Sequence, residues 1–276
     1  MAFALPTSLS PSKVSSFKDC ALAFRYSAID HLPEPPSPAA TKGSLVHRAL
    51  ELLFVEAAPA RTIDTALMCL LRATEEFRSD PDFTELGLDE ATEAAFLADA
   101  EQMVRRYFTL EDPSRINPIG LELRLETKID DLTVRGIIDR LELDDDGGLV
   151  VTDYKTGKVP SVAQEGARLG GVHFYAFLCE RLFGVRPSKV QLIYLGASPD
   201  VIVTRPNEQS IRGLERKVSA IWTAVERACE HEDFRPKPSM LCNWCSFQAY
   251  CPAKGGDPSL VPAMSRAAVP VVINAA

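Results

Sequence analysis

The stretch Gly136–Lys158, GIIDRLELDDDGGLVVTDYKTGK, decides the fold of this chain. Two runs rich in β-forming residues flank the turn signal Asp144–Gly148, so the stretch predicts a β-hairpin. The hairpin is centred on Asp146. Its facing pairs are then Leu143 with Leu149, Leu141 with Val151, and Asp139 with Asp153. The face that carries these residues is apolar near the turn and ends in two carboxylates.

The two aspartates at the end of the hairpin form a candidate metal site. Directly opposed residues place their Cβ atoms about 4.5–5.5 Å apart, and like charges there destabilise a sheet. A divalent ion such as Mg²⁺ or Mn²⁺, which prefers oxygen ligands, would relieve the repulsion between Asp139 and Asp153. Lys155 lies on the same face, where its ammonium would stabilise negative charge on a phosphate. The alternative is an acidic hairpin that faces solvent, and a register shifted by one residue would send the two acids to opposite faces.

Two residues outside the hairpin are candidates to complete this site. His47 lies in the helical segment SLVHRALELLF, and an imidazole can join two carboxylates around a divalent ion. The alternative is a structural or exposed histidine. Glu122, in GLELRLET, is either on the solvent face of a strand or a further acid directed at the metal.

Four cysteines form the second constellation. Cys242, Cys245 and Cys251 follow the spacing C-x2-C-x5-C, and Cys20 lies near the other end of the chain. Four thiolates select zinc or an iron–sulfur cluster, and such a ligand set would join the two ends of the chain. The alternative is incidental cysteines that bind nothing. The remaining cysteines, which lie in apolar helical surroundings, are expected in the core: Cys69, Cys179 and Cys229.

Composition indicates a globular chain without a membrane span. The 276 residues are 46% hydrophobic and 25% charged, which is ordinary for a soluble protein, and no stretch approaches the roughly 20 apolar residues of a transmembrane helix. The N-terminus lacks a basic segment followed by an apolar run, so we expect a cytoplasmic protein with reduced thiols. A net charge of −8 argues against a non-specific nucleic-acid coat protein but is compatible with a nuclease, because a carboxylate-lined metal site is itself negative.

The order of the predicted elements indicates an α/β core with helical elaboration. Helices are predicted over residues 12–29, 41–58, 63–78, 91–110, 162–182 and 208–230. Strands are predicted over residues 120–129, 132–143, 149–156, 190–195 and 201–204. The first helix, with Ser10 or Ser12 as N-cap, is expected to run on through Cys20.

Five short motifs, taken in order, resemble the RecB-like branch of the PD-(D/E)XK nuclease superfamily. They are G-S-L-V-H at Gly43–His47, Glu122, G-I-I-D-R at Gly136–Arg140, D-Y-K-T at Asp153–Thr156, and the four cysteines. The cysteines resemble those of the iron–sulfur members, which include the AddB nuclease domain and CRISPR-adaptation nucleases. The resemblance implies a restriction-endonuclease-like fold: a mixed central sheet flanked by helices, with an N-terminal helical subdomain and an iron–sulfur clasp that joins the termini.

The resemblance also implies a role for each matching residue. The metal ligands for Mg²⁺ or Mn²⁺ would be His47, Asp139, Asp153 and the main-chain carbonyl of Tyr154. The catalytic residues would be Lys155, Asp153, Asp139, Glu122 and Tyr175. The ligands of a 4Fe–4S cluster would be Cys20, Cys242, Cys245 and Cys251. This cluster would be structural, because hydrolysis of a phosphodiester needs no electron transfer.

The same resemblance implies the organisation of the chain. Residues 1–252 would form a single nuclease domain, and residues 253–276 an extended or disordered tail. Within the domain, the helical insertion would cover residues 60–112, the catalytic core residues 113–206, and the C-terminal helix with its cysteine clamp residues 207–252.

The function implied is that of a metal-dependent DNA nuclease, expected to be an exonuclease that acts on single strands or duplex ends in repair or recombination. The chain has no G-x4-G-K-[ST] motif, so it would act alone or with a helicase or another repair partner. One motif departs from the family: Tyr175 is kept from Q-x3-Y, but Gly171 replaces the glutamine. This departure favours an alternative, a non-catalytic or weakly active DNA-binding module of a larger repair complex. A zinc-stapled interaction protein is a third possibility.

Overall fold

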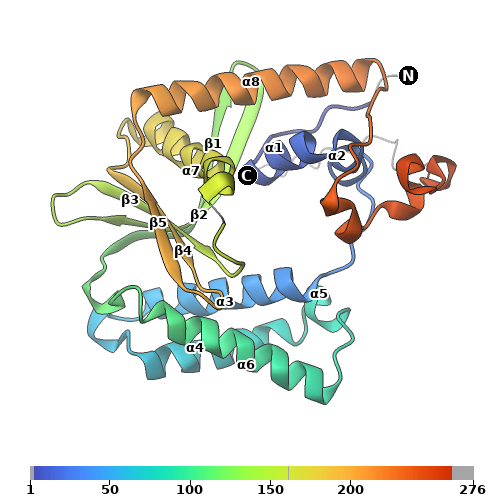
Figure 1. Ribbon diagram of the computed structural model, residues 1–276. Coiled ribbons are helices and arrows are strands. Elements are labelled where there is room, and N and C mark those ends of the chain that lie inside the picture. Colours follow the sequence, from blue (N-terminus) through green and yellow to red (C-terminus); the bar gives the residue numbers. More distant parts are fainter. Residues whose placement is uncertain (1–2, 161, 263–276) are drawn as a thin grey trace, which may run out of the picture. The chain divides into compact units, whose positions relative to one another are not determined.

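The computed structural model describes residues 3–160 and 162–262, and of residues 162–170 only the backbone (Figure 1). The helices are α1 Pro11–Asp19, α2 Ala21–Ala28, α3 Pro38–Val55, α4 Ile63–Phe77, α5 Pro81–Thr84, α6 Glu90–Tyr107, α7 Val162–Phe183 and α8 Glu208–Glu230. The strands are β1 Pro118–Ile129, β2 Leu132–Leu143, β3 Leu149–Lys155, β4 Lys189–Tyr194 and β5 Asp200–Thr204. The short 3₁₀ helices are η1 Ala58–Ala60, η2 Pro113–Arg115, η3 Met240–Trp244, η4 Gln248–Tyr250, η5 Pro252–Lys254 and η6 Pro258–Leu260.

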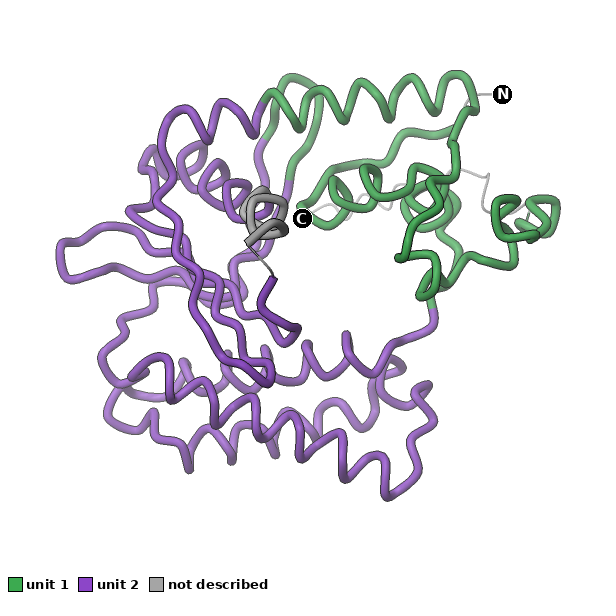
Figure 2. Tube along the Cα trace, viewed as in Figure 1, with its two compact units in different colours: residues 1–34, 128–134, 216–276 green, residues 35–127, 135–215 purple. Residues whose placement is uncertain are grey.

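The chain divides into two compact units (Figure 2). Unit 1 contains residues 1–34, 128–134 and 216–276, so segments from both ends of the chain fold together. Unit 2 contains residues 35–127 and 135–215. The hairpin and the candidate histidine lie in unit 2, and the four cysteines lie in unit 1. The two constellations found in the sequence therefore belong to different units.

The sheet is mixed, with the strand order β1-β2-β3-β4-β5. β2 is antiparallel to β3, β3 is parallel to β4, and β4 is antiparallel to β5. A parallel pair needs a crossover connection, which α7 supplies between β3 and β4. This architecture confirms the predicted α/β class with a mixed central sheet and an N-terminal helical region.

The hairpin of β2 and β3 has the register that the sequence predicts near its turn. The pairs formed there are Leu143 with Leu149 and Leu141 with Val151. In the turn, Gly147 has a φ of +78°, a left-handed conformation that favours glycine. The Asp144 carboxylate accepts the main-chain N–H groups of Asp146 and Gly148. These local hydrogen bonds fix where each strand begins, and the register follows from them.

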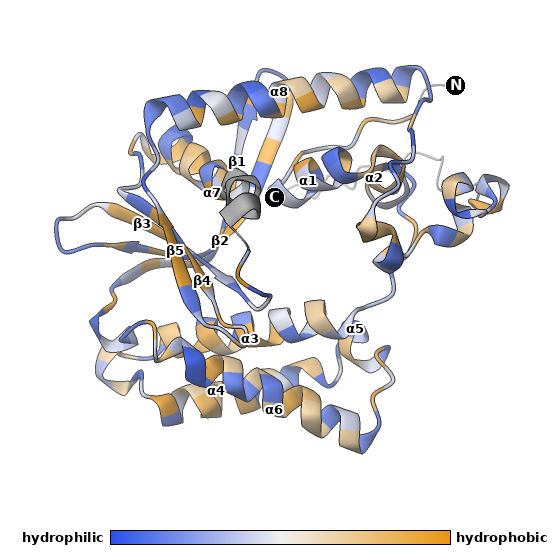
Figure 3. Cartoon of the chain, in the orientation of Figure 1, coloured by the Kyte–Doolittle hydropathy of each residue, from blue (hydrophilic) through white to orange (hydrophobic). Residues whose placement is uncertain are grey.

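One face of the sheet packs against α3, α4 and α6. The buried core of unit 2 joins residues of these helices to Tyr154 of β3, Ile193 of β4 and the adjoining Leu195. Figure 3 shows the matching pattern, with hydrophobic residues gathered on the strands β3 to β5 and on parts of these helices. The helix α7 contacts β4 and carries Tyr175, which bonds to Asp153. Because Asp153 and Tyr154 point to opposite faces of β3, α7 covers the face opposite to α3.

Unit 1 corrects one prediction. The sequence predicts a helix that continues through Cys20, but Cys20 has φ −160° and ψ 110°, an extended conformation that separates α1 from α2. Its N–H bonds to the carbonyl of Ser16 and its carbonyl accepts the N–H of Phe24, so one helix ends and the next begins at this residue. Ser10 is the N-cap of α1, and its hydroxyl accepts the N–H of Lys13.

The C-terminal segment of unit 1 contacts the N-terminal one through direct hydrogen bonds. The Tyr26 hydroxyl donates to the carbonyl of Tyr250 at 2.9 Å, and the N–H of Phe3 donates to the carbonyl of Cys229 at 3.1 Å. The tail predicted to be extended or disordered begins at residue 253. Its described part, up to residue 262, contains most of η5 and all of η6, and residues 263–276 lie outside the described residues.

Candidate active site

Three potential metal ligands from three different elements meet in unit 2. His47 of α3, Glu122 of β1 and Asp139 of β2 each offer one ligand atom, and these atoms lie within 4.8 Å of one another. Two carboxylates and an imidazole form a donor set that holds a divalent cation. His47 and Asp139 are ligands that the sequence analysis expects, and Glu122, expected as a supporting acid, is the third member of the group.

His47 reaches this position because α3 approaches the end of β3 closely. A Cβ added to Gly43, one turn before His47, would lie 3.1 Å from Oγ1 of Thr156, so a larger residue there would require the Thr156 side chain to shift. The Nδ1 of His47 lies 3.4 Å from Oδ2 of Asp139. Burial by itself lowers the pKa of His47, but the hydrogen bond and the charge of Asp139 outweigh burial and raise it.

Glu122 has an unusual backbone. Its φ of +43° is rare for a residue other than glycine and interrupts the regular geometry of β1. Burial raises the pKa of Glu122 to about 7, and the negative charge of Asp139 adds to this effect. A half-buried acid that is repelled by its neighbour is the arrangement that a cation would stabilise.

Asp139 is held in place by the neighbouring strand. Its side chain is almost fully buried, and its Oδ2 accepts the main-chain N–H of Tyr154 at 2.6 Å. Hydrogen bonds of this kind orient a carboxylate before any ligand binds. The carbonyl of Tyr154, which the resemblance implies as a metal ligand, stays a prediction.

Asp153 is not part of the group within 4.8 Å among the described residues. Its carboxylate, only 3% exposed, forms an ion pair with Nζ of Lys155 and accepts the phenol O–H of Tyr175 at 3.2 Å. Burial raises the pKa of Asp153; the charge of Lys155 lowers it and that of Asp139 raises it. The described ladder of β2 and β3 ends at the pair of Arg140 and Thr152, so the facing of Asp139 and Asp153 stays a prediction, and Lys155 is the direct ion-pair partner of Asp153.

The four cysteines line one cavity in unit 1. The cavity has a volume of about 260 Å³, and Tyr26, Trp244 and Phe247 contribute to the same wall. All four thiols, those of Cys20, Cys242, Cys245 and Cys251, are free. Within the described ranges, no three of their sulfurs lie within 4.8 Å of one another. Burial raises the pKa of the Cys245 thiol, and the other three thiols add to this effect.

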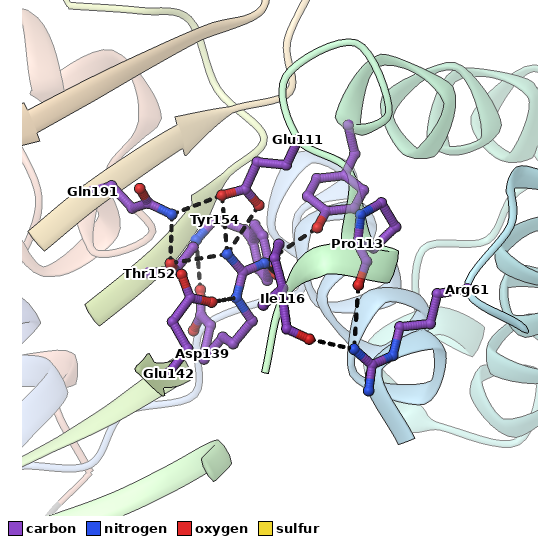
Figure 4. Close-up of polar contacts among 11 residues, drawn as sticks. Arg61, Glu111, Pro113, Ile116, Asp139, Glu142, Thr152, Tyr154 and Gln191 are labelled. Atoms are coloured by element: carbon purple, nitrogen blue, oxygen red, sulfur yellow. Dashed lines mark hydrogen bonds and ion pairs between the residues drawn. The ribbon is translucent and has the colours of Figure 1, made fainter. Parts of the chain in front are cut away.

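A buried ion cluster next to Asp139 was not predicted from the sequence. Arg140, the following residue of β2, is fully buried and forms ion pairs with Glu111 and Glu142 (Figure 4). Alternating polar residues in a strand usually indicate a solvated face, but α3 and α6 cover this one. The sequence did carry one signal of this buried cluster. Polar residues also occupy the positions of the next two strands that lie beside Arg140, namely Thr152 and Gln191, which pair in the sheet.

Comparison with known proteins agrees with this geometry. The sequence profile of the PD-(D/E)XK nuclease superfamily matches residues 8–252. The chain belongs to this superfamily. Membership indicates that the protein is a phosphodiester hydrolase with DNA as the substrate class, and the acidic group around Asp139 is a possible site for a divalent metal. No curated protein matches this superfamily member in sequence.

Solved structures are similar to the nuclease in fold. The crystal structure of a candidate exonuclease from Eubacterium rectale has a TM-score of 0.51 at 11% identity, and the match covers 86% of this chain and 92% of that one. The crystal structure of SSO0001 has a TM-score of 0.44 at 12% identity, with 91% and 88% covered. At this identity the likeness shows the fold alone. Across the described part of the nuclease, no helix is both long and apolar enough to cross a membrane.

Proposed function

We propose that this chain is a Mg²⁺- or Mn²⁺-dependent deoxyribonuclease of the RecB-like branch, acting as an exonuclease in DNA repair or recombination. One observation carries this proposal: His47, Glu122 and Asp139 converge within 4.8 Å, beside the ion pair of Asp153 and Lys155. The raised pKa of Glu122 supports a cation there, because positive charge would stabilise the ionised form of both acids.

Each residue of the candidate site would have its own role in hydrolysis. His47, Glu122 and Asp139 would hold the metal, with Asp153 as the further ligand that the family resemblance implies. A bound Mg²⁺ or Mn²⁺ would polarise the phosphate and lower the pKa of the attacking water. Lys155 carries a fixed positive charge beside this position and would stabilise the negative charge that develops on the phosphate oxygens. Tyr175 orients Asp153 through its hydrogen bond.

We also propose that unit 1 holds a structural 4Fe–4S cluster. Four free thiols that line one cavity supply the usual ligand set of such a cluster. Zinc could occupy the same four thiols, and the metal content of the purified protein distinguishes zinc from the cluster.

The second candidate function is a DNA-binding module with little or no cleavage activity. Gly171 favours it, because this residue replaces the glutamine of the family motif one helical turn before Tyr175. Both functions predict DNA binding, so a cleavage assay separates them.

The test of the nuclease is cleavage of end-labelled single-stranded and duplex DNA with Mn²⁺, by the wild type and by Asp139→Asn. The substitution keeps the shape of the side chain and removes its charge. The matched control is Asp145→Asn in the exposed turn of the same hairpin. We expect Asp139→Asn to lose cleavage and Asp145→Asn to retain it, and circular DNA to resist a true exonuclease.

Two results would contradict the proposed function. Cleavage that survives Asp139→Asn would place the chemistry elsewhere, and DNA binding by the wild type without Mn²⁺-dependent cleavage would support the binding module. For the cluster, protein purified without oxygen should be brown and contain iron and sulfide. A colourless protein that contains zinc would exclude the cluster.

A further inference from the structure

We propose that Arg140 is a positioning residue for the candidate metal site: it holds Tyr154, and Tyr154 in turn holds Asp139 and His47. This inference rests on the proposed function, because it takes Asp139 and His47 as metal ligands. Among the described contacts, the guanidinium of Arg140 bonds to neither of the two side chains, although Arg140 directly follows Asp139 in β2. Its hydrogen-bonded connection to both passes through Tyr154.

The guanidinium of Arg140 is saturated with hydrogen-bond partners in the core of unit 2 (Figure 4). Its bonds go to Glu142 at 2.5 Å, to the hydroxyls of Tyr154 at 2.6 Å and Tyr107 at 3.2 Å, to Glu111 at 2.9 and 3.0 Å, and to Thr152 at 3.2 Å. Gln191 extends the cluster by donating to Glu111 and Thr152, each at 2.8 Å. A planar group with so many fixed donors has a single orientation, so its partners are held too.

The cluster keeps its charge although it is buried. Burial by itself lowers the pKa of Arg140, but the acidic groups around the guanidinium outweigh burial and raise it. Breaking a buried ion pair leaves an uncompensated charge, which is strongly destabilising. The guanidinium is therefore a fixed anchor rather than a mobile side chain.

Tyr154 connects this anchor to the candidate metal site. Its hydroxyl accepts the hydrogen bond of Arg140, while its main-chain N–H donates to Oδ2 of Asp139 at 2.6 Å. Its ring contacts the imidazole of His47 edge to face, with the ring centroids 5.9 Å apart. Arg140 thus fixes the hydroxyl end of the Tyr154 side chain, while the ring of the same residue contacts His47 and its main-chain N–H holds Asp139.

The simpler explanation is that the ion cluster around Arg140 only stabilises the fold. A comparison of Tyr154 with its neighbour Tyr107 distinguishes this explanation from a positioning role. Tyr107 and Tyr154 are both buried, their rings contact each other, and both hydroxyls accept from the same Nη1 of Arg140. Only Tyr154 also contacts Asp139 and His47. A tyrosine-to-phenylalanine change therefore removes the same type of bond at both positions and affects the metal site at one of them.

The experiment compares Tyr154→Phe with Tyr107→Phe in the full chain. Mn²⁺ affinity is measured by calorimetry without DNA, and kcat and KM are measured for linear DNA. We expect Tyr154→Phe to weaken Mn²⁺ binding by about 3- to 10-fold, at or below the lower end of the 10- to 100-fold loss for a direct partner of a metal ligand. We also expect a lower kcat with little change in KM for DNA. Tyr107→Phe should keep the Mn²⁺ affinity of the wild type, whatever its effect on the thermal midpoint.

The outcomes also separate this inference from the proposed function. If Asp139→Asn abolishes Mn²⁺ binding but the two phenylalanine variants bind Mn²⁺ equally well, the positioning role is wrong and the metal site stands. If Asp139→Asn leaves Mn²⁺ binding unchanged, the metal site itself is wrong and this inference falls with it. Both phenylalanine variants keep the aromatic ring and its packing, so a folded protein is expected in each case.

Discussion

At the scale of single residues, the ammonium of Lys155 can pair with either of two groups, the carboxylate of Asp153 or the phosphate of a substrate. Its side chain is 42% exposed while that of Asp153 is 4% exposed. The lysine can therefore reach a substrate from solvent, whereas the aspartate cannot move out of the site. This asymmetry suits a lysine that acts on the substrate and an aspartate that belongs to the metal site.

We predict that Lys155→Ala lowers the cleavage rate by about 10²–10³-fold, the usual cost of losing one charge-stabilising group. Mn²⁺ affinity, measured by calorimetry, should stay within about threefold of the wild type, because Lys155 is not a ligand. The matched control is Lys158→Ala, which removes an exposed lysine three residues along the chain. A large loss of Mn²⁺ affinity in Lys155→Ala would rule out this division of roles.

Gly171 is the residue at which the chain departs from the family motif, and the structure leaves room there. A Cβ added to Gly171 would meet no atom within 4 Å among the described residues, which exclude the side chains of residues 162–170. Glycine inside a helix costs about 0.5–1 kcal/mol relative to alanine. The substitution of a larger residue in α7 is therefore permitted by both packing and helix propensity.

We predict that Gly171→Gln raises both the thermal midpoint and the cleavage rate, whereas Gly171→Ala raises the thermal midpoint alone. The two variants share the gain in helix propensity, and only the glutamine restores an amide one turn before Tyr175. Thermal unfolding and the Mn²⁺-dependent nuclease assay are measured side by side. Equal cleavage by the two variants would show that the missing amide does not limit turnover.

At the scale of elements, Arg61 joins the end of α3 to the beginning of β1. The Arg61 guanidinium, which is buried, donates to the carbonyls of Pro113 at 3.2 Å and Ile116 at 2.7 Å (Figure 4). It also bonds to the carbonyls of Glu56 at 2.9 Å and Phe54 at 3.3 Å. These four carbonyls lie at or near the ends of α3 and η2, where the regular hydrogen bonds of a helix run out. The carbonyl of Pro113 also accepts the main-chain N–H of Ile116 at 3.4 Å.

We predict that Arg61→Ala lowers the free energy of unfolding by at least about 2 kcal/mol, because several buried carbonyls lose their donor. Arg72→Ala is the control: Arg72 is mostly exposed, with only a 3.9 Å ion pair to Glu56, and should change the stability by less than about 0.5 kcal/mol. Denaturant unfolding measures both values. A stability loss below that of Arg72→Ala would show that water replaces the guanidinium at these carbonyls.

At the scale of the whole molecule, the two ends of the chain meet in unit 1 through main-chain and side-chain contacts. Besides the bond of Tyr26 to Tyr250, Nζ of Lys237 donates to the carbonyl of Lys18 at 2.9 Å. The cysteine cavity lies among these contacts. An iron–sulfur cluster bound in this cavity would add its bonds to the cysteines to the contacts that already join the two ends of the chain.

We predict that Cys242→Ser loses the visible absorbance of the anaerobically purified protein and lowers its thermal midpoint. Each kcal/mol lost corresponds to about 2–4 °C for a chain of this size. Cys229→Ala is the control, since Cys229 is a buried thiol of the same unit that does not line the cavity. Unchanged absorbance and midpoint in Cys242→Ser would contradict a cluster at this position.

The sequence by itself determined the features that depend on local chemistry. The turn from Asp144 to Gly148 specifies the register of β2 and β3, because its hydrogen bonds form between residues a few positions apart. The same register, continued one pair beyond Arg140 and Thr152, would place Asp139 opposite Asp153. Helix periods and strand alternation likewise placed most elements, since each depends only on the pattern of a short segment.

Only the tertiary structure decided which residues share the site. The sequence assigns Glu122 a supporting role, but a positive φ and the packing of β1 bring it to His47 and Asp139. The alternation of β2 cannot reveal that Arg140 is buried, because one of the two acids that compensate its charge, Glu111, is nearly thirty residues away. Burial and pairing of charges are set by contacts between distant segments, and these contacts exist only once the chain has folded.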